Sequence, residues 1–449
     1  MGLHTAGPAA LDRSPVPPRP AASRRYAWVI FALSFGLLLS DYMSRQVLNV
    51  VFPDLKAQWL LSDGQLGSLS GIVALMVGVL TFPLSLLADR WGRSRCLVAA
   101  AAVWSLATLG CAISASYGEM FVARFFVGAG EAAYGSVGIA LVLSIFPARL
   151  RATLSGAFMG GGAFGTVLGV SVGGVLAQHL GWRWAFAVMG LFGLALAAVY
   201  AFVVTERRLA AQVAMVSGAG RGGADERAPL RTMLPRLFSS VSVVCAYIGS
   251  GLQMFIAMAL LAWMPTFLNR SYGMPSAKAG LVAGAFALFT GVGTIVGGMV
   301  SDRLSRTAPI RKWTVSITCS VGTFALLLCG FGLHAGPLQL TLVAAGALLS
   351  NATAGPAAAM VANLTPAAVA ATAMATLTLA NSLLGLAPGP TVTGMLADHV
   401  GLLGALRLIP LVAVVACAAF AIGRHYYPRD LRRLGLLPEA APAGLESQP

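Results

Sequence analysis

Charged side chains are scarce in this chain. Only 10% of its 449 residues are Asp, Glu, Lys or Arg, whereas a soluble domain carries roughly 25%. Hydrophobic residues make up 57% of the sequence. So little charge cannot cover the surface of a water-soluble protein of this length. The composition therefore excludes a soluble globular class and indicates a protein that lies largely in lipid.

Sequence patterns of zinc proteases, phosphate-binding loops and metal sites are also missing. The six cysteines contain no C-x-x-C pair, and the five histidines are scattered over tails and loop ends. No H-E-x-x-H pattern and no phosphate-binding G-K-[ST] pattern occurs. We therefore expect no catalytic residues, no metal and no organic cofactor. The cysteines are interpreted as small apolar residues.

Long apolar runs recur along the whole chain. A helix that crosses a bilayer needs about 20 mostly apolar residues, and twelve segments of that kind can be marked. We predict an all-α integral membrane protein with twelve transmembrane helices in two pseudo-symmetric six-helix bundles. The predicted spans are 26–52, 64–88, 96–115, 118–145, 154–179, 184–204, 238–268, 277–304, 313–333, 337–364, 367–397 and 405–423.

Basic residues are divided unevenly between the two ends of these spans. The net charge is +15, and with Met1 placed inside most of the 30 Lys and Arg residues fall on the inner side. The outer side receives only Lys56, Arg183, Arg270, Lys278 and Arg407. This bias is expected of a membrane protein and argues against nucleic-acid binding. It predicts a multi-pass protein of the cell inner (plasma) membrane with both termini in the cytoplasm.

A polar, Arg-rich interval separates the first six spans from the last six. We predict a disordered cytoplasmic N-tail at 1–25, an N-terminal bundle at 26–205, a cytoplasmic linker at 206–236, a C-terminal bundle at 237–423 and a C-tail at 424–449. An internal repeat supports this division, because Asp89-Arg90 and Asp302-Arg303 each follow the second span of a half in similar surroundings. Parallel repeats of this kind occur in transporters.

These loops carry a family resemblance. Residues 85–95 resemble the major facilitator signature G-x-L-A-D-R-x-G-R-[KR], with Ser85 in place of the first glycine. Arg124, Gly128 and Gly130 match a second motif of that superfamily, R-x-x-x-G-x-G, in the fourth span. The resemblance covers roughly residues 26–423. It implies the major facilitator fold and transport of a solute by alternating access.

Within the superfamily, the sequence is most similar to the Spinster-like branch. Glu131 and Tyr134 follow Gly130 as in the G-E-A-x-Y of Spinster-like transporters. Residues 41–45 resemble the first-helix segment of the same branch, with Ser44 where an acid is usual and Asp41 three residues earlier. Anion:cation symporters have a similar first helix and remain the alternative branch.

Four ionisable residues lie inside the predicted spans: Asp41, Arg45, Arg124 and Glu131. An intramembrane charge is a functional hypothesis by default, because it costs at least ~2.5 kcal/mol at the bilayer centre. At about 1.5 Å per residue, Asp41 and Arg124 lie at the same depth, and Glu131 shares the face of Arg124. We predict a proton switch in which Arg124 pairs with Asp41 or Glu131 in one state and releases it in another. A static salt-bridge cluster is the alternative.

The repeated loops predict a cytoplasmic gate. Asp89 and Asp302 end helices at the inner face, where a carboxylate can cap a helix of the other half. By resemblance, the capped helices would begin near Pro366 and Thr153. The basic partners in this predicted gate are Arg90, Arg93, Arg303 and Arg306. These arginines also suit a simpler role as topology anchors.

Glycine and proline mark two further helices. Gly161, Gly165, Gly169 and Gly173 form a four-residue stripe in the fifth span, which predicts close helix packing. Pro388-Gly389-Pro390 interrupts the eleventh span, and a kink is expected there because proline removes a helix hydrogen bond.

Polar side chains in five spans are candidates for the substrate cavity that the family resemblance implies. Each of them also suits helix packing. The candidates are Tyr42, Gln46, Tyr134, Gln253, Trp263, Asn351 and Asn381.

Together these patterns predict a monomeric secondary active transporter whose partners are membrane lipids and a small-molecule substrate. We expect a small organic or amphipathic solute, with anionic and lysolipid-like forms both compatible with Arg45 and Arg124, and a proton as the coupling ion. Symport and drug or lipid antiport are both open. A non-transporting receptor or a lipid scramblase is a further alternative.

Overall fold

The computed structural model describes residues 24–146, 148–206, 208–209, 212, 240–306, 308–365 and 370–433. Every regular element in those residues is a helix. The predicted N-tail up to residue 23, most of the predicted linker and the C-tail from residue 434 lie outside the described residues. The last helix continues to Arg433, into the predicted C-tail.

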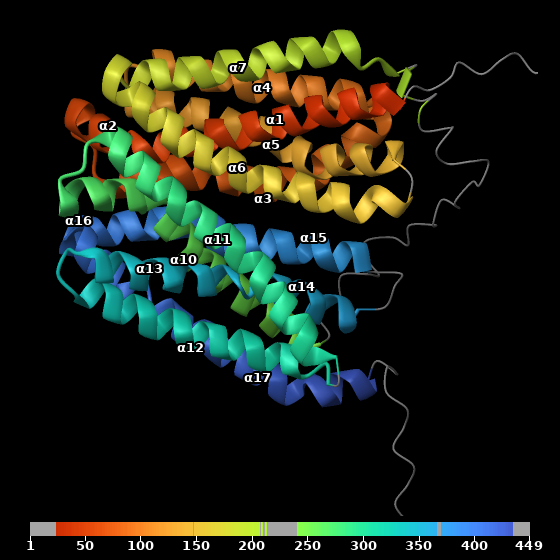
Figure 1. Cartoon of the computed structure of the whole chain (residues 1–449), viewed down its shortest axis with the longest axis vertical. Helices are drawn as coiled ribbons and strands as arrows, with labels where there is room; N and C mark the ends of the chain where they lie inside the picture. Colours follow the sequence, from red (N-terminus) through yellow and green to blue (C-terminus); the bar gives the residue numbers. More distant parts are fainter. Residues whose placement is uncertain are drawn as a thin grey trace, which may run out of the picture.

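The two halves of the chain form two packed groups of helices, red to yellow and green to blue in Figure 1. The N-terminal half consists of α1 (Arg24–Val50), α2 (Phe52–Trp59), α3 (Asp63–Trp91), α4 (Arg93–Ile113), α5 (Tyr117–Ile145), α6 (Ala148–Leu180) and α7 (Trp182–Val203). The C-terminal half consists of α10 (Val241–Tyr272), α11 (Ser276–Ser305), α12 (Arg311–Gly332), α13 (Pro337–Asn351), α14 (Ala354–Asn363), α15 (Ala370–Asn381), the π-helix η2 (Ser382–Leu386), α16 (Pro388–Leu408) and α17 (Leu411–Arg433).

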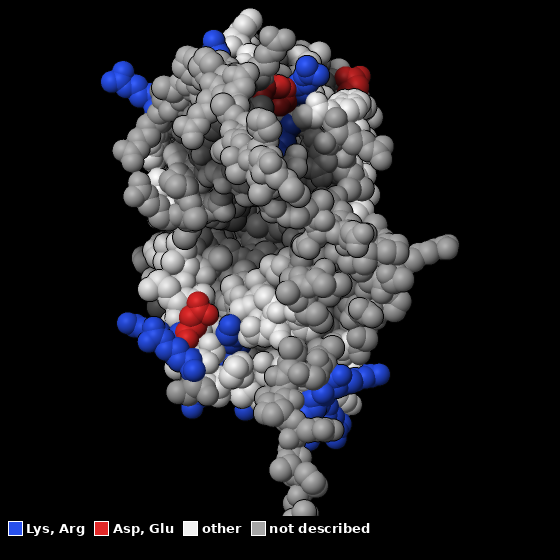
Figure 2. Space-filling view, turned by 90° about the vertical axis from the view of Figure 1, so that its right-hand side faces the viewer, with Lys and Arg blue, Asp and Glu red and all other residues white. Residues whose placement is uncertain are grey.

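The bundles have two distinct ends. We call the end at which α1 begins and α17 ends the terminal face, and the end that carries α2 and the α6–α7 turn the far face; they lie right and left in Figure 1. Figure 2 looks onto the terminal face and shows blue Lys and Arg side chains over its lower, C-terminal half. Exposed arginines on this half are Arg303, Arg306, Arg311, Arg424, Arg429, Arg432 and Arg433.

Eleven helical segments of the described chain are long and apolar enough to cross a membrane. The prediction of a polytopic, all-α membrane protein is therefore confirmed. The remaining predicted span, 367–397, is built from α15, η2 and the first part of α16. Ala387 N donates to Ser382 O at 3.0 Å, a five-residue step that widens the helix just before Pro388. Where the sequence predicts a kink at Pro388–Pro390, the structure has the short π-helix η2 just before Pro388.

The glycine stripe of α6 faces α1. A Cβ atom on Gly165 would lie 2.9 Å from the carbonyl oxygen of Leu39, and one on Gly169 would lie 2.8 Å from Cα of Met43. Only glycine permits so close an approach of two helix backbones. Ser171, between Gly169 and Gly173, lies inside α6 rather than on the strand-to-helix turn that a nucleophilic serine in G-x-S-x-G requires.

The two halves meet mainly along two helix pairs, α6 with α11 and α3 with α16. A Cβ on Gly280 of α11 would lie 2.5 Å from the carbonyl oxygen of Val170. A Cβ on Gly67 of α3 would lie 2.3 Å from the carbonyl oxygen of Pro390. The halves therefore touch backbone to backbone in the far-face part of these helices.

Candidate functional site

Three ionisable side chains meet between α1 and α5, and we call Asp41, Arg45 and Glu131 the charge cluster. Arg45 Nε and Nη2 donate to Glu131 Oε2 at 3.0 and 2.5 Å. The Glu131 side chain is 0% exposed, whereas that of Arg45 is 21% exposed. The pair therefore consists of a fully buried acid and a partly exposed cation.

Asp41 lies one helical turn before Arg45 and is 4% exposed. Its side chain lies close to Glu131 and Arg45. Among the described residues, Asp41 Oδ1 and Glu131 Oε1 are both buried without a hydrogen-bond donor. Two buried carboxyl groups thus lie close to one cation, and one oxygen of each has no hydrogen-bond donor among the described residues.

Arg124 does not take part in this ion pair. Its guanidinium, fully buried, donates to the carbonyl oxygens of Leu69 at 3.3 Å, Ser44 at 3.1 Å and Arg45 at 3.2 Å. It therefore joins α5 to α3 and to the end of α1. In this conformation Arg45, and not Arg124, pairs with Glu131.

The cavity candidates of the N-terminal half surround the charge cluster. Tyr42 is partly exposed, and the Arg45 guanidinium lies 5.4 Å from the centre of its ring. Gln46 is buried and accepts from Asn49 Nδ2 at 2.7 Å. Tyr134 is also buried, and its hydroxyl donates to the carbonyl oxygen of Ser34. Of these three, Tyr42 is the one that is partly exposed, as Arg45 is.

The cavity candidates of the C-terminal half mostly join helices to one another. Gln253 donates to Ser320 Oγ at 2.6 Å and is 0% exposed. Asn351 donates to the carbonyl oxygen of Thr290 at 3.2 Å. Asn381 is partly exposed at the start of the π-helix, and its Oδ1 has no donor among the described residues. Gln253 and Asn351 likewise each keep an amide oxygen that has no donor among the described residues.

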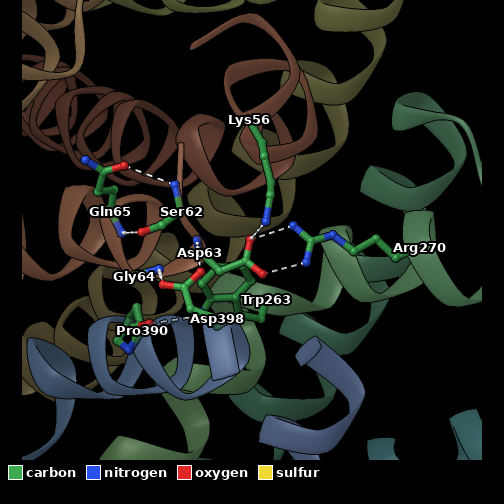
Figure 3. Close-up of polar contacts among 9 residues, drawn as sticks. All are labelled: Lys56, Ser62, Asp63, Gly64, Gln65, Trp263, Arg270, Pro390 and Asp398. Atoms are coloured by element: carbon green, nitrogen blue, oxygen red, sulfur yellow. Dashed lines mark hydrogen bonds and ion pairs between the residues drawn. The ribbon is translucent and has the colours of Figure 1, made fainter. Parts of the chain in front are cut away.

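An ion-pair network on the far face joins the two halves, and we call Lys56, Asp63, Arg270 and Asp398 the far-face network (Figure 3). Arg270 of α10 donates to both carboxylate oxygens of Asp63, each at 2.7 Å. Lys56 of α2 donates to the same carboxylate at 2.6 Å. The Asp63 side chain is only 4% exposed and that of Arg270 is 30% exposed, so the carboxylate of this bidentate pair is shielded from water.

Asp398 of α16 caps the first turn of α3 across the same interface (Figure 3). Its carboxylate accepts from the backbone N–H of Asp63 at 2.6 Å and of Gly64 at 2.8 Å. The first N–H groups of a helix have no partner within the helix, and the helix dipole favours an anion there. One half therefore supplies the cap for a helix of the other half.

Close packing supports the far-face network from beneath. Trp263 Nε1 donates to the carbonyl oxygen of Pro390 at 2.9 Å, and its ring packs against Phe52 of the other half at 5.1 Å between centroids. A Cβ on Gly394 would lie 2.2 Å from the carbonyl oxygen of Asp63. Trp263, a cavity candidate from the sequence, thus belongs to the closed far-face interface.

The sequence patterns did not identify this network as a site. Asp63 and Arg270 are 207 residues apart, and Asp63 and Asp398 are 335 residues apart. Lys56 and Arg270 were interpreted only as outer-side charges. The available signal was that Asp63 and Asp398 flank apolar spans on the side that has few charges.

The predicted gate on the terminal face differs from the far-face network in its exposure and in its contacts. The side chains of Asp89 and Arg90, like the region of Pro366, lie outside the described part of the structure. Arg93, Arg303 and Arg306 are exposed. Asp302 is 77% exposed and lies 3.9 Å from Lys312 of its own half. Within the described residues, these four gate side chains form no ion pair between the halves.

Comparison with known proteins agrees with this architecture. The family model of the Major Facilitator Superfamily matches residues 34–387. A gallate transporter of Pseudomonas putida is 27% identical over 360 residues, which cover 74% of this chain and 77% of that transporter. Protein spinster homolog 1 of Xenopus laevis is 26% identical over 66% of this chain and 57% of its own length.

The fold also has a solved counterpart. The structure of a bacterial homologue of the human lysosomal transporter Spinster, in an inward-facing and unoccupied conformation, has a TM-score of 0.79 to this chain. It covers 91% of this chain and 99% of its own chain at 19% identity. Helix content, spans and family match agree, so this chain belongs to the Major Facilitator Superfamily and is a multi-pass membrane transporter rather than an enzyme.

Proposed function

We propose that this transporter carries a small organic anion together with a proton by alternating access. The charge cluster is the observation on which this proposal depends. Arg45 is the cation that a solute can reach, and Glu131 and Asp41 are the acids that can hold a proton. The gallate transporter of Pseudomonas putida is a relative whose name specifies a carboxylate.

Coupling follows from competition for Arg45. A substrate carboxylate that binds the exposed side of this guanidinium weakens its pair with Glu131. Glu131 is then a buried anion without its cation, which is costly in a membrane interior, so it takes up a proton. A proton shared between Glu131 and Asp41 also supplies the donor that both carboxyl groups lack. Anion and proton therefore bind together.

The far-face network would act as the gate on one side of the membrane. We propose that the far face is external, that the termini lie in the cytoplasm and that the membrane is the cell inner membrane, because Lys and Arg are concentrated at the terminal end. The structure then corresponds to a state that is closed to the outside. Opening requires the Asp63–Arg270 pair to break and Asp398 to leave α3.

The test is flux into liposomes that contain the full-length protein. The substrates are gallate, other hydroxylated organic acids, a lysolipid and a cationic dye, each with and without an imposed pH gradient. We expect pH-driven uptake of one or more organic acids. Glu131→Gln and Asp41→Asn should abolish accumulation driven by the gradient but retain exchange of labelled for unlabelled substrate.

Asp54→Asn is the matched control, because it also converts a carboxyl to an amide but lies in α2, outside the spans. It should leave pH-driven uptake unchanged. The coupling proposal fails if both cluster variants still accumulate substrate against a gradient. Dye efflux would support the drug antiport alternative, and lipid mixing without any gradient would support a scramblase.

A further inference from the structure

A groove lies on the outer surface of the N-terminal half, between α4 and α5. Its volume is about 780 Å³. Apolar side chains form most of its lining, among them Leu106, Ile113, Val122 and Phe126, which are 50–82% exposed. The groove ends at Ser114 and Glu119, close to the far face. It is therefore distinct from the charge cluster and from the interface between the halves.

The position of the groove restricts what can fill it. Both of its helices are predicted to cross the membrane, and both are long and apolar enough to do so. Apolar side chains exposed on the outside of a transmembrane bundle face the hydrocarbon of the bilayer. The body of the groove is thus open to the acyl chain of a lipid in the leaflet at the far face.

Two opposite charges lie at the end of the groove and contact the same peptide unit. Arg183 Nη2 donates to the carbonyl oxygen of Ser114 at 3.0 Å, and Glu119 Oε2 accepts from the backbone N–H of Ala115 at 2.8 Å. The Arg183 guanidinium also lies 4.3 Å from the centre of the Trp182 ring.

Both charges remain available to a ligand. Arg183 donates to Ser114 and more weakly to Gln58, which uses two of its five N–H donors. Glu119 is exposed, and its Oε1 is not the oxygen that accepts from the Ala115 N–H. In the part of the chain that the structure describes, neither residue forms an ion pair.

We infer that this groove binds one phospholipid with a zwitterionic primary-amine head group, that is, phosphatidylethanolamine. Arg183 holds the phosphate, Glu119 accepts from the ammonium group, and an acyl chain lies between α4 and α5. A cation and an anion on one peptide unit match the adjacent phosphate and ammonium of such a head group. Phosphatidylcholine has no N–H donor for Glu119, and phosphatidylglycerol has no cation for it.

The test measures bound lipid by native mass spectrometry of the full-length protein. The protein is titrated in detergent with phosphatidylethanolamine, phosphatidylcholine or phosphatidylglycerol of identical acyl chains. We expect one tightly bound phosphatidylethanolamine and at least about tenfold weaker binding of the other two, because a hydrogen bond to a charged group is lost. Glu119→Gln and Arg183→Gln should remove this preference.

A variant that fills part of the groove next to its charged end tests the groove while both charges are kept. A Cβ on Gly118 meets nothing within 4 Å, so Gly118→Leu fits the fold and occupies the groove. It should abolish the tight site. Gly332→Leu is the matched control, because it also enters open space, at the end of α12. It should bind lipid as the unmodified protein does.

Three results would overturn the inference. Equal binding of the three lipids by the unmodified protein would show only non-specific lipid around the bundle. Unchanged lipid preference in Glu119→Gln and Arg183→Gln would remove the head-group assignment. A dimer that dissociates in Gly118→Leu but not in Gly332→Leu would show that a second copy of the chain fills the groove. None of these results depends on transport, so the inference can fail while the proposed function stands.

Discussion

At the scale of single residues, the two arginines inside the spans have different surroundings. Arg124 is fully buried and uses its N–H groups on three backbone carbonyl oxygens. Arg45 is partly exposed and pairs with a carboxylate. The contacts of Arg124 suit a residue that holds helices together. Those of Arg45 suit a residue that exchanges partners.

Arg124→Lys and Arg45→Lys should therefore differ in their effects. A lysine at position 124 cannot reach three carbonyl oxygens, and each lost hydrogen bond to a charged group costs roughly 1.5–3 kcal/mol. We expect a clearly lower melting temperature for Arg124→Lys in detergent. Arg45→Lys should keep the melting temperature but raise KM for the organic acid. If Arg124→Lys keeps its melting temperature but loses pH coupling, then Arg124 and not Arg45 is the coupling cation.

The sequence identified the intramembrane charges because each of them is unusual in an apolar span. It could not identify which charges pair. The sequence places Asp41 and Arg124 at the same depth, but depth says nothing of how each helix is rotated about its axis or how far a side chain extends. Arg45 and Glu131 are 86 residues apart, so no local pattern reports their contact.

At the scale of helices, the predicted spans agree well with the structure, since hydropathy is a local property. The far-face network depends instead on how helix ends meet across the two halves. Asp63 begins α3, Arg270 lies near the end of α10, and Asp398 lies in the middle of α16. Each looks like an ordinary loop-flanking charge until the helices are assembled. The π-helix is also a tertiary feature, because only the proline-rich segment after it is visible in the sequence.

Breaking the Asp63–Arg270 pair should open the far face. In Asp63→Asn the carboxylate that binds both cations is lost, and a coupling of about 1–3 kcal/mol would change the ratio of closed to open molecules about 5- to 150-fold. Spin labels at Ser62 and Ser271, in a chain without cysteines, should show a longer distance between the halves. Both positions are exposed on the far face.

The charge-swapped pair Asp63→Arg, Arg270→Asp should recover part of the short distance, because it restores an ion pair between the halves. Asp54→Asn serves again as the control and should leave the distances unchanged. An unaltered distance distribution in Asp63→Asn would mean that packing alone keeps the far face closed.

At the scale of the whole molecule, the two ends of the interface are unequal. On the far face, backbone contacts between α3 and α16 lie directly beneath a partly buried ion pair. The predicted gate residues described on the terminal face are exposed and bind within their own half. This asymmetry is what a transporter needs if it is open to one side at a time.

Gly67→Ala should weaken the closed far-face interface, at a position inside a predicted span. The new methyl group would lie 2.3 Å from the carbonyl oxygen of Pro390, so the halves must separate at the far face. We expect a cysteine at Thr391 in this interface to react faster with a membrane-impermeant thiol reagent applied to the far side. Gly160→Ala, which meets nothing within 4 Å, should leave the labelling rate unchanged. Equal rates in the two variants would refute the tight-contact explanation.

The cap of α3 has a consequence for how the carrier can move. Its anion comes from α16, so α3 has a satisfied first turn only while the two halves are docked. When they part, amide N–H groups at the start of α3 and the Asp398 carboxylate must each find water instead. Water must therefore enter between α3 and α16 when the halves part, because a gap filled only with lipid cannot satisfy these polar groups. Conditions that lower water activity should hold the carrier shut.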